Sequence, residues 1–226
     1  MTQRSPASAA TRAMRDGVVD AAGGPIIFDY VQARGPEGVR FDVWYCGEHL
    51  CELAKTVQGA ALRRYAAPAR AAYLAVGEID GARAAPAAID LPELPAMVAH
   101  AERFIGEPLA TKRRRDASAD VIESAIVYPA FLRVPDERMD EVCRWYDEEH
   151  LPMLMDCPQW AMARRFRIAP GQGLDWTHVA LHYLSDIRAL QSPQRDAARK
   201  TPWRDALIAE GWFAPEYRVC YRARDF

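Results

Sequence analysis

Side chains that can move protons gather in one stretch of the second half of the chain, residues 145–152, which read WYDEEHLP. His150 is the strongest candidate for chemistry, because imidazole has the ordinary pKa closest to neutral pH and can both accept and donate a proton. Tyr146 lies four residues earlier, which places the two side chains one turn apart on the same face of a helix. The pair predicts acid/base catalysis: a protonated imidazole suits dehydration, and a neutral one suits proton abstraction next to a carbonyl.

Residues near this pair are candidates for binding a substrate. Trp145 would form an aromatic wall, whereas Glu149 points elsewhere unless the end of the helix unwinds. Arg164 and Arg165 fall on a predicted strand, so their side chains alternate and one faces each side of the sheet. Arg165 is a candidate for binding a substrate carboxylate, with a surface salt bridge as the competing interpretation.

The stretch is repeated earlier in the chain. Residues 44–50 read WYCGEHL, which is 101 positions before WYDEEHL, and the pair of arginines followed by an aromatic residue at 63–65 recurs at 164–166 with the same offset. A shared motif at one fixed distance predicts two copies of one unit of about 100 residues. Tyr45 and His49 are the counterparts of Tyr146 and His150, and both join the substrate-binding candidates.

The first copy departs from the second at the motif itself. Cys46 and Gly47 replace an aspartate and a glutamate, and Cys51 replaces Pro152. We therefore expect the second copy to hold the active site. Two alternatives stay open: the repeated motif could be architecture alone, or the histidines could bind a ligand, including haem, without acting as catalysts.

Hydrophobic periodicity and turn residues predict the elements that carry the motif. In the first unit these are a strand at 25–31, a helix at 36–50, strands at 61–65 and 73–79, a second helix at 95–105 and a strand at 109–115. The second unit repeats the order: a strand at 124–132, a helix at 135–150 that Pro152 ends, strands at 162–168 and 178–184, helices that begin at Ser192-Pro193 and Thr201-Pro202, and a strand at 217–221.

A β-α-β-β-α-β order is that of the ferredoxin-like unit, whose helices cover one face of a four-stranded sheet. The other face must be buried too, and the second unit in the chain can supply the cover. The sequence therefore predicts an α+β fold in which two tandem ferredoxin-like units form a fused pseudo-dimeric α/β barrel with helices outside. The predicted divisions are a flexible tail at 1–23, a first unit at 24–116 and a second unit at 123–226.

Bulk composition excludes several classes of function. The chain has 226 residues with 29 basic and 31 acidic side chains and a net charge of −2, so we expect neither nucleic acid nor a membrane surface as a partner. Five cysteines without a C-x-x-C pair suggest reduced thiols and a cytoplasmic protein. Phosphate-cradling, dinucleotide-binding and zinc-peptidase motifs are absent from the sequence, so we expect no metal and no cofactor. A fused pseudo-dimer could remain a monomer or form a homodimer.

The combination of W-Y-x-x-E-H-L-P with AMARRF at 161–166 and TPWR at 201–204 resembles the dimeric α/β-barrel superfamily, and within it the EthD-like proteins. The resemblance implies a cofactor-independent lyase or isomerase, of dehydratase or cyclase type, acting on a small aromatic or polyketide-like compound. The alternatives are a haem-binding protein or cofactor-free monooxygenase of the same superfamily, and a small-molecule binding protein without catalysis.

Overall fold

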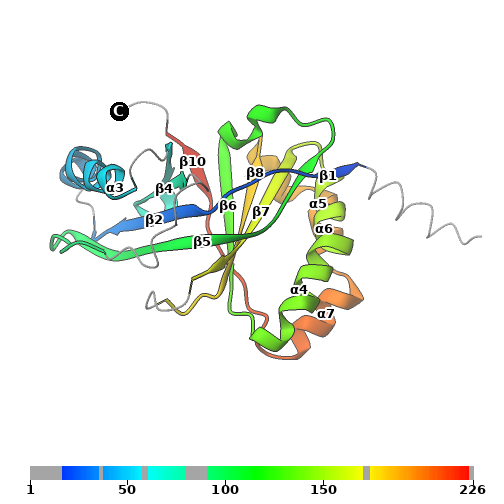
Figure 1. Ribbon diagram of the computed structural model, residues 1–226. Helices are drawn as coiled ribbons and strands as arrows, with labels where there is room; N and C mark the ends of the chain where they lie inside the picture. Colours follow the sequence, from blue (N-terminus) through cyan, green and yellow to red (C-terminus); the bar gives the residue numbers. More distant parts are fainter. Residues whose placement is uncertain (1–16, 36–37, 58–60, 80–90, 170–173, 224–226) are drawn as a thin grey trace, which may run out of the picture.

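The computed structural model describes residues 17–35, 38–57, 61–79, 91–169 and 174–223. Its centre is a closed, antiparallel barrel of eight strands, with helices on opposite outer sides (Figure 1). Around the barrel the strands follow the order β5-β2-β4-β3-β10-β6-β8-β7, and pairing between β7 and β5 closes the ring. The predicted fold class is confirmed.

The first half contributes four of these strands and one long helical segment. The strands are β2 (Ile26–Ala33), β3 (Leu62–Ala67), β4 (Ala72–Glu78) and β5 (Val98–Arg114). The helical segment consists of α2 (Gly38–Trp44), the π-helical turn η1 (Tyr45–His49) and α3 (Leu50–Thr56), and a short 3₁₀ turn, η2 (Pro68–Arg70), links β3 to β4.

The second half follows the 3₁₀ segment η3 (Ala119–Glu123) and has the strands β6 (Ile126–Leu132), β7 (Trp160–Ile168), β8 (His178–Leu184), β9 (Glu216–Tyr217) and β10 (Cys220–Arg222). Its helices are η4 (Asp136–Arg138), α4 (Met139–Trp145), the π-helical turn η5 (Tyr146–His150), α5 (Leu151–Met155), η6 (Ile187–Gln191), α6 (Pro193–Ala198) and α7 (Pro202–Ala209). Ser192 and Thr201 cap α6 and α7 by accepting backbone N–H bonds, with proline at the next position as the sequence predicts.

Apolar side chains form three cores. One fills the barrel with residues of both halves, such as Phe28, Phe104, Phe131 and Phe166. The other two lie outside the barrel, each between the helices of one half and the strands of that half. The motif residues belong to these outer cores, Tyr45 and His49 to the first and Trp145 and Tyr146 to the second.

The predicted helix at 95–105 is wrong, because these residues enter strand β5. Glu102 and Phe104 face the barrel interior while Arg103 and Ile105 face the outer core, which is the two-residue period of a strand. The local sequence has helical spacing, but β2 pairs with β5 from Ile26 to Ala33 and this tertiary pairing overrides it. The strand predicted at 109–115 is the second part of the same long strand.

The helix that carries the second motif does not end at His150 but continues to Met155. A π-turn precedes Pro152, whose missing N–H falls where the regular bonding pattern is already interrupted.

The expected tail at 1–23 is also wrong in part. Residues 1–16 lie outside the described part of the chain, but β1 (Val18–Asp20) pairs with Lys112, Arg113 and Arg114 at the end of β5. No helix within the described ranges has the length and apolar character needed to cross a membrane.

Candidate functional site

The repeated motif folds in both halves as a π-helical turn inside an α-helix. The N–H of Leu151 donates to the carbonyl of Tyr146, five residues back, and Leu50 donates in the same way to Tyr45. Because Cys51 stands where the second copy has proline, Pro152 is not what causes the turn. Such turns are frequent at functional sites, since they change the direction of side chains within a helix.

The π-turn brings Trp145 onto His150. Residues five apart point about 140° from each other on a regular α-helix, yet these two rings stack with centroids 4.3 Å apart and planes 22° apart. Tyr146 meets the imidazole edge-on at 5.4 Å. Trp145 and Tyr146 therefore both lie against His150, and the indole ring covers one face of the imidazole.

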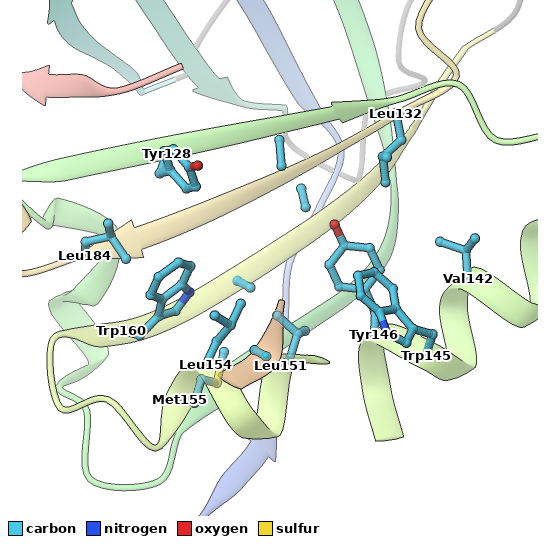
Figure 2. Packing of buried hydrophobic residues seen from close by; sticks show 14 of the residues in the cluster. Tyr128, Leu132, Val142, Trp145, Tyr146, Leu151, Leu154, Met155, Trp160 and Leu184 are labelled. Carbon is cyan, nitrogen blue, oxygen red and sulfur yellow. The ribbon is translucent and has the colours of Figure 1, made fainter. Parts of the chain in front are cut away.

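His150 lines a narrow cavity between the helices and strands of the second half. Figure 2 shows Trp145 and Tyr146 projecting from the helix toward the strands that carry Tyr128 and Trp160. The cavity is lined by Tyr128, Ala130, Trp145, Tyr146, His150, Leu154, Trp160, His182, Arg195, Arg199, Phe213, Pro215 and Tyr217. Its volume is about 20 Å³, room for about one water molecule. Side chains therefore fill most of the space around His150.

The hydrogen bonding of His150 defines its chemical form. Its Nδ1 lies 3.3 Å from the carbonyl oxygen of Ala198, and because a carbonyl only accepts, Nδ1 carries the proton. Removal from water lowers the pKa of His150 well below its ordinary value, and nearby His182 lowers it further. The imidazole is therefore neutral at pH 7, with its lone pair on Nε2.

His182 has the opposite tautomer. The indole Nε1 of Trp160 can only donate, and it donates to Nδ1 of His182 over 3.1 Å, so the proton of His182 sits on Nε2. Burial lowers the pKa of His182 to about 3, and the positive charge of Arg165 adds to the shift. The cavity thus contains one neutral imidazole that can accept a proton and one that can donate a hydrogen bond.

Cationic and phenolic groups complete the wall of the cavity. Arg195 on α6 lies 3.5 Å from the hydroxyl oxygen of Tyr128 and also donates to the carbonyl of Leu190 over 2.9 Å. The ring of Tyr128 stacks on Tyr217 at 5.3 Å. Burial raises the pKa of Tyr128 and of Tyr146, so both hydroxyls stay protonated and can donate to an oxygen of a bound molecule.

Two predicted binding residues have other partners. Glu149 accepts hydrogen bonds from Thr201 over 2.6 Å and from Trp145 over 3.2 Å, which joins the motif to the start of α7. Arg165 is buried rather than on the surface and pairs with Asp147 at 2.7 Å. Its guanidinium carbon lies 5.1 Å from the centre of the Tyr146 ring and packs over that ring.

His49 and Tyr45 are not brought to the His150 cavity but lie in the outer core of the first half. Nε2 of His49 is 2.7 Å from Oδ2 of Asp29, and the other carboxylate oxygen accepts from Arg103 over 2.8 Å. Asp29 pairs with Ala75 in the sheet as Ala130 pairs with Ala180, so it is the counterpart of the alanine that lines the second-half cavity. In the first half a carboxylate occupies the space that Ala130 leaves open.

Sequence reasoning missed several residues of the cavity. Tyr128, Trp160, His182, Arg195 and Tyr217 converge from β6, β7, β8, α6 and β9. His178 and His182 are four residues apart in β8, a spacing that places both side chains on one side of the strand, and this is the signal in the sequence that could have pointed to His182. The described residues contain no group of three or more His, Cys, Asp or Glu side chains that could hold a metal ion.

A haem does not fit at either motif histidine as the side chains stand. The space beside His150 is about 20 Å³, far below the 300 Å³ or more of typical cofactor pockets. Nε2 of His49 is engaged by a buried carboxylate. His49 would have to leave its carboxylate partner before it could bind iron, whereas His150 keeps Nε2 available and lacks the space for a porphyrin.

No protein-family model matches the chain, and no curated protein matches it. Solved structures do. An anthrone oxidase-like protein has a TM-score of 0.59 at 12% identity, over 92% of this chain and 94% of that one. A ferredoxin-fold protein from Listeria monocytogenes, related to antibiotic biosynthesis monooxygenases, has a TM-score of 0.52 at 9% identity, over 90% and 97%. A mutant chlorite dismutase from Candidatus Nitrospira defluvii has a TM-score of 0.51 at 8% identity, over 92% and 95%. At such identities the likeness concerns the fold alone: the chain has the ferredoxin-type barrel fold of the dimeric α/β-barrel proteins, with both halves in one polypeptide.

Proposed function

We propose that the second half is a cofactor-independent monooxygenase for a small aromatic carbon acid, of the kind that anthrone represents. The observation that carries the proposal is the neutral His150, whose protonated Nδ1 is held by a backbone carbonyl so that Nε2 is available as a base. A fold shared with an anthrone oxidase-like protein and with a protein related to monooxygenases supports the choice of chemistry. The EthD-like resemblance of the motif remains part of this proposal.

The reaction begins when Nε2 of His150 removes a proton from the acidic CH₂ group, which is conjugated to the substrate carbonyl through the aromatic rings. The carbanion spreads its charge onto the carbonyl oxygen, where Nε2–H of His182 and the guanidinium of Arg195 are the available donors. The carbanion then reduces O₂, and one oxygen atom forms the new C=O while the other leaves as water. The sum is R₂CH₂ + O₂ → R₂C=O + H₂O, and His150 returns its proton to the water that leaves.

A substrate of this size must open the cavity. Arg195 and Arg199 line its outer side, and the Arg199 side chain is exposed, with its guanidinium 6.0 Å from the Tyr217 ring. These long side chains can move without disturbing the core, whereas Trp145 and Trp160 are buried and form a fixed wall. Entry is therefore proposed between α6 and β9.

The test is oxygen consumption with anthrone as the substrate. His150→Gln keeps a similar shape and removes the base, so turnover should fall about 10²- to 10⁴-fold. His100→Ala is the matched control, because this half-exposed histidine lies outside the cavity and turnover should be unchanged. If His150→Gln consumed oxygen at the wild-type rate, the proposal would be refuted.

The same experiment separates the other proposals for this site. A lyase or isomerase would use the same proton abstraction but would convert its substrate without O₂, so product formed under anaerobic conditions would favour it. A haem protein would give a Soret band that titrates with haemin to one equivalent and weakens in His150→Gln or His49→Gln. A non-catalytic binding protein would bind anthrone without turnover.

A further inference from the structure

A second cavity, of about 380 Å³, lies at one end of the barrel. It is lined by residues at the ends of strands and in the adjoining turns, among them Tyr30, Arg70, His100, Trp176, Glu216 and Arg218. It lies on the barrel side of the sheet, since Arg218 packs on Tyr30 and on Phe131 of the barrel core, whereas the preceding residue, Tyr217, faces His150. The two cavities therefore lie on opposite faces of the sheet, and the function of this one is a separate question.

A buried ion pair forms the inner wall of this barrel-end cavity. Arg218 donates to both oxygens of Glu102, over 2.6 and 2.9 Å, and its Nε donates to Oε1 of Glu216 over 3.1 Å. Its guanidinium carbon lies 4.2 Å from the ring centre of Tyr30 and 4.4 Å from that of Phe131. Held from every direction, Arg218 is a fixed part of the wall rather than a free ligand for a bound molecule.

Other polar groups in the barrel-end cavity have weak hydrogen bonds or lack a hydrogen-bond partner. Arg70 is half-exposed, and its contacts with Oε1 of Glu216 and with the carbonyl of Tyr217 are both 3.5 Å, at the outer limit for hydrogen bonds. Both arginine contacts of Glu216 within the described part of the chain use Oε1, which leaves Oε2 for a ligand. The hydroxyl of Tyr30 is buried and has no hydrogen-bond partner among the described residues, which is costly unless a ligand supplies one.

The balance of charge indicates the class of ligand. Three arginines and three carboxylates line the cavity: Arg70, Arg133, Arg218, Glu102, Asp175 and Glu216. An added anion or cation would leave this neutral set with an excess charge, whereas a zwitterion would not. The loosely held arginine and carboxylate are 3.5 Å apart, a spacing that suits the adjacent carboxylate and ammonium groups of an α-amino acid.

We propose that the barrel-end cavity binds a free α-amino acid with an apolar side chain. Arg70 and the hydroxyl of Tyr30 bind its carboxylate, Oε2 of Glu216 binds its ammonium group, and Trp176 contacts its side chain. Arg70 leaves its two long contacts to reach the carboxylate. The proposal does not depend on the chemistry proposed for His150.

The test is calorimetric titration at pH 7 with L-phenylalanine and two molecules that lack one charge. 3-Phenylpropionate has no ammonium group and phenethylamine has no carboxylate, so each should bind at least about tenfold more weakly than phenylalanine, since each loses a charged hydrogen bond. If 3-phenylpropionate bound as tightly as phenylalanine, the cavity would be an anion site and the zwitterion proposal would be wrong. Absence of phenylalanine binding at millimolar concentration would equally overturn it.

Variants locate the binding. Arg70→Gln and Tyr30→Phe should each weaken phenylalanine binding roughly tenfold or more, and neither should destabilise the fold, because the first is half-exposed and the second loses no hydrogen bond. Tyr65→Phe is the matched control, since this tyrosine also lies in the barrel core but does not line the cavity. His150→Gln should bind phenylalanine like wild type. Binding that survived both Arg70→Gln and Tyr30→Phe would place phenylalanine elsewhere.

Discussion

His150 and His182 show how the position of one proton fixes what a histidine can do. Each has one ring nitrogen engaged by a partner of known polarity, the carbonyl of Ala198 in one case and the indole of Trp160 in the other. The remaining nitrogens therefore differ, one being a base and the other a donor. Protonation of either ring would remove this difference, and burial opposes protonation of both.

The two buried, neutral histidines should make the stability of the protein depend on pH. The pKa of His182 falls from 6.5 unfolded to about 3 folded, so below pH 6.5 the unfolded chain binds a proton that the folded chain refuses. Its contribution is fully present above pH 6.5 and is lost as pH falls toward 3. Between pH 7 and pH 5 the wild type should lose about 2 kcal/mol of unfolding free energy that His182→Gln does not lose.

Urea denaturation of both proteins at the two pH values measures this difference. Glutamine can still accept from the indole of Trp160, so the variant preserves the hydrogen bond while removing the titrating group. Equal losses in the two proteins would mean that His182 titrates normally in the folded state.

At the residue scale, the repeated motif contains the aromatic side chains that lie against His150 but not the other residues that line the cavity. Trp145, Tyr146 and His150 stand close together in the chain, so a repeated motif is enough to find them. Tyr128 and His182 become neighbours only because β6 pairs with β8 in a register that sets them opposite each other. That register depends on the whole sheet, which local spacing does not encode.

At the scale of elements, the π-turn of the motif determines which side chains of the helix are buried. It inserts one extra residue in a helical turn, so that the helix before it buries Val142 and Trp145 while the helix after it buries Leu151 and Leu154. The sequence did not predict it, because a π-turn and an α-turn have the same composition, and Pro152 was interpreted as the end of the helix. The same limit explains the wrong helix at 95–105, where strand pairing outweighs helical spacing.

Deletion of Glu148 should replace the π-turn by a regular α-turn, because it removes the extra residue that the turn accommodates. Trp145 and His150 would then be four residues apart and about 40° apart around the helix, so their rings would share a face without the close stacking that the π-turn produces. Helix content measured by circular dichroism should stay the same, and anthrone oxidation should fall, since the imidazole of His150 is no longer held in its present direction. Glu148→Ala is the control that keeps the residue count, and it should retain activity; a fully active deletion would show that the π-turn is dispensable.

At the scale of the whole molecule, the two halves are joined by more than the linker between them. Strand β5 of the first half pairs with β2 and then, from Gly106 to Arg113, with β7 of the second half. Strand β10 of the second half pairs in turn with β3 of the first. The repeat predicted a closed barrel, because two sheets of one design must bury each other, but it did not predict that β5 would run through both sheets.

The buried pair of Glu102 and Arg218 also joins the first half to the second. Breaking this pair tests whether the two halves unfold together. Although burial alone would raise the pKa of Glu102, its bonds to Arg218 lower it overall, so the carboxylate is charged at pH 7. Arg218→Ala would leave that charge without its buried partner, and we expect a loss of about 3–5 kcal/mol of unfolding free energy. Because the strands interlock, urea denaturation should show this loss in one cooperative transition reported equally by both halves.

Arg133→Ala is the matched control, since its pair with Asp175 is exposed, at 57% and 83% of the two side chains. Such a pair contributes about 0–1 kcal/mol, so the transition of this variant should stay close to wild type. Two separate transitions in Arg218→Ala, with only one of them shifted, would mean that the halves fold independently and that the shared strands β5 and β10 do not couple them. A single shifted transition would instead make the barrel, rather than either half, the unit that holds both cavities in place.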